Sequence, residues 1–301
     1  MSALPARSRG VRGITLDAAG LPLSGLLGTP PGAAPRATVL ALHGGGMSAA
    51  YFDGQAHPDQ SLFTLGMRLG YQVLALDRPG YGASAGPLPQ GQTLAAQART
   101  VRAALTRFAA DHPVGAGVFV LAHSYGGKLA LTCAAGPALP GPLLGLDISG
   151  CGHRFAVPAA QLPSAAGHGH WRHNWGALRL YPPDTFRGCA DMVTAMPVRE
   201  RVEAGRWPDA FVRLAARVRV PTRLTFAEHE AWWRHDEAAL AELRAHLCGA
   251  EPLVVERQAD AGHNISLGWS ARTYHLRALA FLEQCLARRA AAAPAPRQAA
   301  A

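Results

Sequence analysis

A serine stands where an apolar run ends and a helix-compatible segment begins. Residues 117–122 read GVFVLA, and the letters H-S-Y-G-G that follow contain Ser124. A sharp turn from a parallel strand into a helix leaves space only for small residues two positions before and two positions after its central residue. Those positions hold Ala122 and Gly126, so A-H-S-Y-G replaces the usual G-x-S-x-G pattern. Such a turn raises the serine above the carboxyl edge of a sheet, at the positive end of a helix. The pattern predicts that Ser124 is a nucleophile.

A serine hydroxyl attacks at neutral pH only when a base takes its proton, and that base needs an acid to orient it. In a strand–turn–helix architecture the three groups follow one another as serine, acid and histidine. His263 lies in A-G-H-N after the apolar residues 253–255, and Glu230 follows the segment at 220–226. The order predicts that His263 is the base and Glu230 the acid.

Two other carboxylates compete with Glu230 for the role of the acid. Asp147 lies near the end of the apolar run at 142–150, where a strand is expected, and Glu228 is two residues from Glu230 on the same strand. The alternation of a strand would direct Glu228 to the same side as Glu230. We favour Glu230 and keep both alternatives. Asp77 precedes the nucleophile and belongs to a turn, so a structural role is expected for it.

The elements that must position these residues alternate regularly along most of the chain. Short apolar runs at 37–46, 71–84 and 117–122 are followed by helix-compatible segments, and this alternation is typical of an α/β fold with a mostly parallel central sheet flanked by helices. The alternation stops after residue 150 and resumes near residue 218. We therefore expect an N-terminal tail at 1–11, a core at 12–150 and 218–287, an inserted cap at 151–217 and a disordered C-terminal tail at 288–301.

Four landmarks occur in a single order: His43-Gly44-Gly45-Gly46, the D-R-P-G-Y-G run from Asp77, the Ser124 turn and Ala261-Gly262-His263. With them the chain resembles the α/β-hydrolase superfamily of serine hydrolases, over nearly its whole length. The resemblance implies the α/β-hydrolase fold and aligns Glu230 with the family's acid. The backbone N–H of Tyr125, just after the nucleophile, is an expected donor to the oxyanion. The resemblance places the second donor at Gly45, with Gly46 as the alternative.

The expected cap is rich in aromatic residues, which indicate an apolar pocket or the cap's own core. We select Trp171, Trp175 and Trp232 as candidate walls of a substrate pocket, which would favour an apolar or aromatic acyl group. The histidines of the string GHGHWRHNW are an alternative metal site. No aspartate or cysteine in that string completes a ligand set, so no metal is predicted.

Composition excludes several other classes of protein. The formal charge of +9 comes from scattered arginines, since Lys128 is the only lysine, and no nucleic-acid motif is present. Scattered arginines can also attract an acidic carrier protein. Five cysteines in irregular positions indicate reduced thiols in the cytoplasm. No signal peptide or membrane-spanning run is apparent, so no membrane partner is expected.

The predicted function is that of a cytoplasmic serine hydrolase that cleaves a small carboxylic ester or thioester through an acyl-enzyme and needs no cofactor. An alternative is a biosynthetic thioesterase, acyltransferase or cyclase that acts on a carrier-bound acyl group. A third hypothesis is a non-catalytic protein that uses the same fold to bind a ligand. A serine at the turn argues against the family branches that use an aspartate nucleophile. The oligomeric state is not predicted.

Overall fold

A computed structural model describes residues 7–58, 60–188 and 192–292, and this part of the chain forms an eight-stranded sheet. The first two strands and their neighbour pair in antiparallel fashion and the other pairs are parallel, which confirms the predicted mostly parallel α/β fold. In spatial order the strands are β1 (Val11–Asp17), β2 (Pro22–Gly28), β4 (Gln72–Leu76), β3 (Thr38–Leu42), β5 (Val118–His123), β6 (Leu143–Ser149), β7 (Thr222–His229) and β8 (Leu253–Gly262).

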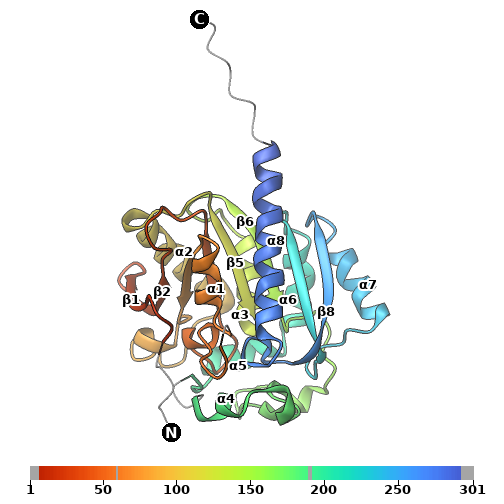
Figure 1. Cartoon of the computed structure of the whole chain (residues 1–301). Coiled ribbons are helices and arrows are strands. Elements are labelled where there is room, and N and C mark those ends of the chain that lie inside the picture. Colours follow the sequence, from red (N-terminus) through yellow and green to blue (C-terminus); the bar gives the residue numbers. More distant parts are fainter. Residues whose placement is uncertain (1–6, 59, 189–191, 293–301) are drawn as a thin grey trace, which may run out of the picture.

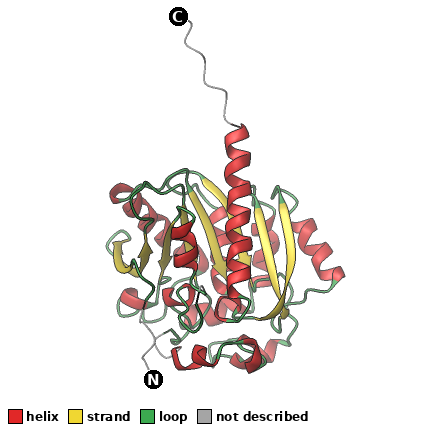
Figure 2. Ribbon diagram, viewed as in Figure 1, coloured by secondary structure: helices red, strands yellow, loops and turns green. Residues whose placement is uncertain are grey.

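Helices cover both faces of the sheet (Figures 1 and 2). The near face carries α1 (Leu62–Arg68) and α8 (Ala271–Ala292). The far face carries α2 (Leu94–Asp111), α3 (Tyr125–Ala134), α6 (Trp207–Ala215) and α7 (Glu237–His246). Helix α8 extends past residue 287, the expected end of the core. The expectation of a disordered tail was wrong for residues 288–292, which are helical because arginine and alanine are strong helix formers; residues 293–301 of that tail lie outside the described structure.

The central strands are apolar throughout because each faces a helix layer on both sides. Every residue of β3 is buried. Leu40 and Leu42 belong to the core under α2 and α3, whereas Val39 and Ala41 belong to the core under α1 and α8. A parallel sheet buried in this way holds the carboxyl ends of its strands at one fixed edge, where the predicted site residues follow them.

The segment between β6 and β7 lies partly across that edge. Helices α4 (Pro183–Gly188) and α5 (Val198–Ala204) lie below the sheet in Figure 1, at the edge where α8 begins. Helix α6 instead packs against α3, and its Trp207 and Phe211 belong to the far-face core. The proposed limits of the cap, 151–217, thus include a helix of the core layer. The 3-10 helices are η1 (Ala49–Phe52), η2 (Gly82–Ser84), η3 (Ala159–Gln161), η4 (Trp171–Asn174), η5 (Leu178–Leu180) and η6 (Ile265–Leu267).

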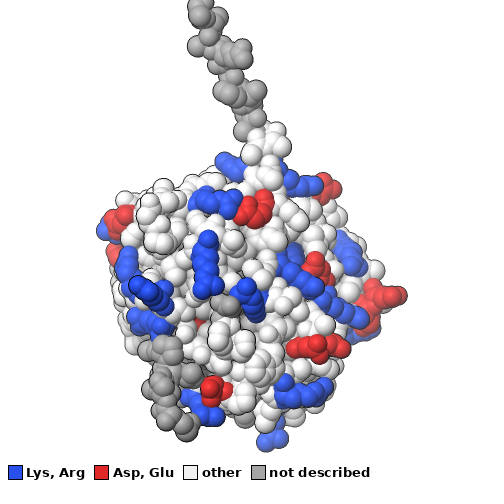
Figure 3. All heavy atoms as spheres, in the orientation of Figure 1, with Lys and Arg blue, Asp and Glu red and all other residues white. Residues whose placement is uncertain are grey.

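Basic side chains are spread over the face that α1 and α8 cover, with acidic ones between them (Figure 3). No helix within the described ranges is long and apolar enough to cross a membrane. Four cysteines in these ranges carry free thiols, and Cys189 lies outside them; the four are Cys133, Cys151, Cys248 and Cys285.

Candidate active site

Ser124 occupies the turn between β5 and α3 in a strained backbone conformation. Its φ is 52° and its ψ is −116°, a region that residues other than glycine rarely adopt and that tends to occur at functional sites. A Cβ atom at Gly126 would lie 2.1 Å from the backbone oxygen of Leu42 on β3, so only glycine fits there. Ala122 is fully buried in the far-face core. The turn therefore accommodates alanine before the serine but requires glycine after it.

Ser124, His263 and Glu230 form one chain of hydrogen bonds. The Ser124 Oγ lies 3.1 Å from the His263 Nε2, and the His263 Nδ1 lies 2.8 Å from Oε2 and 3.0 Å from Oε1 of Glu230. A carboxylate can only accept, so Nδ1 carries the proton and Nε2 is free to take the proton of the serine. The His263 and Glu230 side chains are buried, and the Trp232 N–H donates to the Glu230 Oε1 at 2.9 Å.

The two alternative acids, Asp147 and Glu228, form their hydrogen bonds with groups other than His263. Asp147 is fully buried and accepts hydrogen bonds from the Arg223 Nη1 at 2.5 Å and from the Tyr274 hydroxyl at 2.9 Å, on the α8 side of the sheet. Glu228 is exposed and accepts from the Asp260 N–H at 2.8 Å. The structure thus brings Glu230 to His263 and brings neither alternative there.

The glycine-rich loop after β3 lies against Ser124. A Cβ atom at Gly44 would lie 3.1 Å from the Cβ of Ser124. The Gly46 N–H already donates to the Tyr81 hydroxyl at 3.1 Å. The Gly45 N–H has no acceptor in the part of the chain that the structure describes, and the Tyr125 N–H has none within α3, because Tyr125 is its first residue. This hydrogen bonding favours Gly45 over Gly46 as partner of Tyr125 in an oxyanion hole.

The sequence profile described as the alpha/beta hydrolase family matches residues 39–294. The chain belongs to the alpha/beta hydrolase family. No curated protein matches this hydrolase in sequence.

Several solved structures share the fold of this hydrolase. A peroxisomal alpha-beta hydrolase from Saccharomyces cerevisiae is 14% identical with a TM-score of 0.62, over 95% of this chain and 90% of that one. The Cif epoxide hydrolase from Acinetobacter nosocomialis is 14% identical with a TM-score of 0.62, over 91% and 90%. A cold-adapted esterase from an Arctic intertidal metagenomic library is 17% identical with a TM-score of 0.53, over 92% and 99%. At these identities the likeness establishes the fold alone.

Two histidines close to Ser124, His43 and His123, are held by neighbouring groups. The His43 Nδ1 donates to the Gly44 carbonyl at 2.8 Å, and its Nε2 accepts from the Arg78 N–H at 3.0 Å. Burial lowers the pKa of His43 well below its usual value, so the ring is neutral. His123 stacks on Tyr51 at a centroid distance of 4.7 Å, and burial lowers its pKa as well. Neither ring contacts the Ser124 hydroxyl through a hydrogen bond in the described structure.

A buried ion pair that the sequence analysis did not single out joins the loop after β4 to α5, and its arginine also binds the loop after β3. Arg78 is fully buried, and its Nε donates to the His43 carbonyl at 2.7 Å while its Nη2 donates to the Gly44 carbonyl at 3.1 Å. The same guanidinium pairs with Glu200 on α5. The signal in the sequence was Arg78 within D-R-P-G-Y-G, but its partner follows 122 residues later and has no local pattern.

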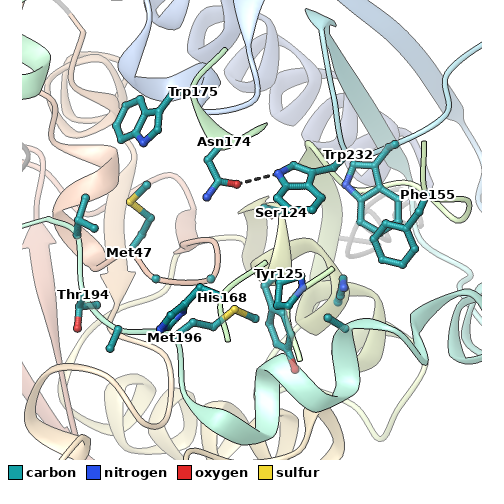
Figure 4. A pocket seen from close by; sticks show the side chains of 18 residues that line it. Met47, Ser124, Tyr125, Phe155, His168, Asn174, Trp175, Thr194, Met196 and Trp232 are labelled. Atoms are coloured by element: carbon teal, nitrogen blue, oxygen red, sulfur yellow. Dashed lines mark hydrogen bonds between the residues drawn. The ribbon is translucent and has the colours of Figure 1, made fainter. Parts of the chain in front are cut away.

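A cavity of about 430 Å³ opens at Ser124 and is lined mostly by apolar side chains. Figure 4 shows Trp232 and Phe155 on one side of Ser124, and Met47 and Trp175 on the other. Trp175 and Trp232, two of the three candidate pocket residues, line this cavity, and the Trp232 Nε1 donates to the Asn174 Oδ1 at 2.8 Å. The third candidate, Trp171, has a side chain outside the described structure.

Several pocket residues have no sequence signal that could have identified them. Met47, Phe155 and Met196 come from three separate segments and meet only in the folded chain. A Cβ atom at Gly45 would lie 3.0 Å from the Met196 sulfur, so this side chain closes the cavity near the glycine-rich loop.

The remaining cap aromatics and histidines have other surroundings. Trp207 is buried and donates to the Gly152 carbonyl at 2.7 Å. Among the cap histidines, His168 lines the cavity and His173 contacts the Gln161 Oε1 at 3.1 Å. No group of three or more histidine, cysteine, aspartate or glutamate residues that could hold a metal ion occurs within the described residues.

Proposed function

We propose that this alpha/beta hydrolase is a serine hydrolase that cleaves a carboxylic ester or thioester through an acyl-enzyme. The single observation that carries the proposal is the hydrogen-bonded chain Ser124–His263–Glu230, whose serine opens into an apolar cavity. The serine hydroxyl stands at the positive end of α3, and the glycine-rich loop lies beside it.

In the first half of the reaction the Ser124 Oγ attacks the substrate carbonyl while its proton moves to the His263 Nε2. The carbonyl oxygen becomes negatively charged and accepts hydrogen bonds from the N–H groups of Gly45 and Tyr125. The bond to the leaving alcohol or thiol breaks, and this group takes the proton from Nε2. Glu230 holds the imidazole in the required tautomer and stabilises its charged form throughout.

In the second half a water molecule enters the site and gives a proton to the His263 Nε2 as its oxygen attacks the acyl carbon. The oxyanion forms again in the same place, and the bond to the Ser124 Oγ breaks. The serine recovers its proton from Nε2, and the carboxylic acid leaves. The chemistry uses protein groups and water only, so we propose no cofactor.

The lining of the cavity supports an apolar or aromatic acyl group. Its lining includes Trp175, Trp232 and Trp233, together with Phe155 and two methionines. Apolar walls of this kind bind substrates by removing apolar surface from water, and a few polar groups then set the orientation.

A fluorophosphonate probe tests the proposal, because it reacts only with a serine activated by a base. We expect labelling of the wild-type protein at Ser124, identified by mass spectrometry of the labelled peptide, and no labelling of Ser124→Ala. His263→Ala should label far more slowly than the wild type, by about two orders of magnitude or more. A folded wild-type protein that stays unlabelled would refute the proposal.

Exposed arginines support a second candidate, in which the acyl group arrives on an acidic carrier protein. Arg172, Arg179 and Arg199 are exposed and have no acidic partner within the described residues. Charges of one sign attract an oppositely charged partner, and salt weakens that attraction. We expect the turnover of a carrier-bound thioester to fall with ionic strength more steeply than that of a free thioester. Equal salt dependence of the two would exclude this candidate.

A further inference from the structure

The only lysine of the chain, Lys128, lies in the first turns of α3 and lines the cavity that opens at Ser124. Its exposed fraction is 4%, so almost the whole side chain is removed from solvent. The described residues that line this cavity include no aspartate or glutamate. Among the described residues, the lining of the cavity therefore includes one buried lysine and no carboxylate.

Aromatic rings surround the ammonium group. The Lys128 Nζ lies over four rings at centroid distances of 5.2 to 5.5 Å, those of Tyr125, Phe155, Trp207 and Trp233. The faces of aromatic rings attract a cation, which lowers the cost of burying it. No hydrogen bond or ion pair to Nζ occurs within the described structure. An ammonium group has three N–H donors, so it retains donors for a ligand.

The nearest acidic side chains are engaged with other groups. Glu200 on α5 pairs with Arg78. The Glu203 Oε2, also on α5, accepts from the Leu94 N–H at 2.8 Å and from the Tyr125 hydroxyl at 3.1 Å. These carboxylates act on Lys128 only through space, and no acid in the described structure lies within ion-pair distance of Nζ.

We propose that Lys128 is an anion anchor and that the substrate carries a carboxylate at some distance from its scissile carbonyl. A buried cation without a partner is costly, and a carboxylate that reaches it regains both the ion pair and charge-assisted hydrogen bonds in a dry environment. The aromatic walls bind the apolar part of such a substrate, and Lys128 selects the charged end. This inference rests on the proposed function for the position of the scissile bond.

Binding to Ser124→Ala tests the inference without any turnover. The probes are the monoethyl esters of dicarboxylic acids from succinic to suberic acid, each compared by calorimetry with the neutral primary amide of the same length. A second set carries the carboxylate or amide on the alcohol side. We expect the best-fitting acid to bind about 10- to 100-fold more tightly than its amide, as for a charge-assisted hydrogen bond.

The double variant Ser124→Ala/Lys128→Met should lose this difference. Methionine keeps the length and apolar body of lysine and removes the charge. Ser124→Ala/Arg99→Met is the matched control, because Arg99 is exposed on α2 outside the cavity and its loss changes the net charge equally. Equal binding of acids and amides across both series, or a preference that survives Lys128→Met, would overturn the inference. Tighter binding of the amides would indicate that Lys128 donates to a neutral acceptor, and this result would also overturn the inference.

If Lys128→Met does not fold, a spectroscopic measurement tests the role of Lys128 as an anion anchor. Since the chain has one lysine, incorporation of ε-¹³C-lysine into Ser124→Ala yields one lysine ε-carbon signal, whose shift follows the protonation of Nζ. We expect the best-fitting monoethyl ester to move this titration to higher pH and its amide to leave it in place. A titration unmoved by every acid contradicts the anchor. Failure of the proposed hydrolase activity appears separately, as absence of probe labelling at Ser124.

Discussion

At the scale of single residues, two hydrogen bonds define the role that we expect for Glu230. Its carboxylate accepts the His263 Nδ1–H and is held by the Trp232 N–H, both from within a buried site. A neutral amide at this position would offer an N–H to Nδ1 and favour the tautomer with its proton on Nε2. That tautomer cannot take the proton of Ser124.

We therefore expect Glu230→Gln to lower kcat/KM by roughly a thousandfold or more, with little change in the far-ultraviolet circular dichroism. The measurement is steady-state hydrolysis of an activated ester. Glu228→Gln is the matched control and should stay close to the wild type, because Glu228 is exposed and contacts Asp260. Equal losses in the two variants would contradict the assignment of Glu230.

A second prediction at the scale of residues concerns Lys128 and the pH dependence of the selectivity for an anionic substrate. Burial lowers the pKa of Lys128 to about 8, and the surrounding Cys151, Glu200, Glu203 and Arg78 act on it more weakly. Below this pH the amine is charged and can bind a carboxylate; above it the amine is neutral. The preference for an anionic substrate is therefore present below about pH 8 and lost as the pH rises through that value.

The measurement is the ratio of kcat/KM for a half-ester and its neutral amide between pH 6 and 10. Any group that acts equally on both substrates cancels in the ratio, so the ratio reports groups of the free enzyme that sense the anion. A ratio that stays constant across this range would contradict the role of Lys128.

At the scale of elements, the turn between β5 and α3 depends on the close approach of α3 to β3. A Cβ atom at Gly126 would lie 2.1 Å from the Leu42 carbonyl oxygen, which is backbone and cannot rotate away. Ser124, Tyr125 and Lys128 lie at the start of α3 and line the cavity. This helix can pack so closely against the sheet only because residue 126 has no side chain.

Gly126→Ala should lower the free energy of unfolding by about 3 kcal/mol or more, since α3 must move away from β3. It should also lower kcat, because the Ser124 hydroxyl moves with the helix. Urea denaturation measures the first effect and initial rates the second. Gly205→Ala serves as control: no atom lies within 4 Å of its added Cβ and its φ is −68°, so we expect a change within about 0.5 kcal/mol.

At the scale of the whole molecule, a buried ionic network ties the sheet to α8 beneath the candidate site. Asp147 on β6 accepts from Arg223 on β7 and from Tyr274 on α8, and Arg223 also reaches Glu256 on β8. The network joins three strands and a helix that lie far apart in sequence. Its removal should affect the stability of the fold and leave the chemistry at Ser124 in place.

Asp147→Asn should lower the free energy of unfolding by about 2 to 3 kcal/mol, because Arg223 stays buried with one partner fewer. Per folded molecule, kcat should stay near the wild-type value. Urea denaturation and rates corrected for the folded fraction measure the two quantities. Asp111→Asn, in an exposed pair with Arg107, should cost no more than about 0.5 kcal/mol. A loss of kcat in folded Asp147→Asn would instead indicate that Asp147 is the acid that orients His263.

The sequence by itself determined the fold class, the turn at Ser124 and the order of the candidate residues. These depend on short-range rules: buried parallel strands are apolar throughout, and a tight turn admits only small neighbours such as Ala122 and Gly126. Such rules act over a few residues, so they can be read from one chain.

Only the tertiary structure decided which carboxylate meets His263 and what fills the cavity. Asp147, Glu228 and Glu230 all follow the expected strands, and the pairing of β7 with β8 shifts register between Ala227 and His229, just before Glu230. A register shift changes which side chains point together and has no local signature. The surroundings of Lys128 likewise come from residues as distant as Phe155 and Trp233, which meet only because the folded chain packs them against α3.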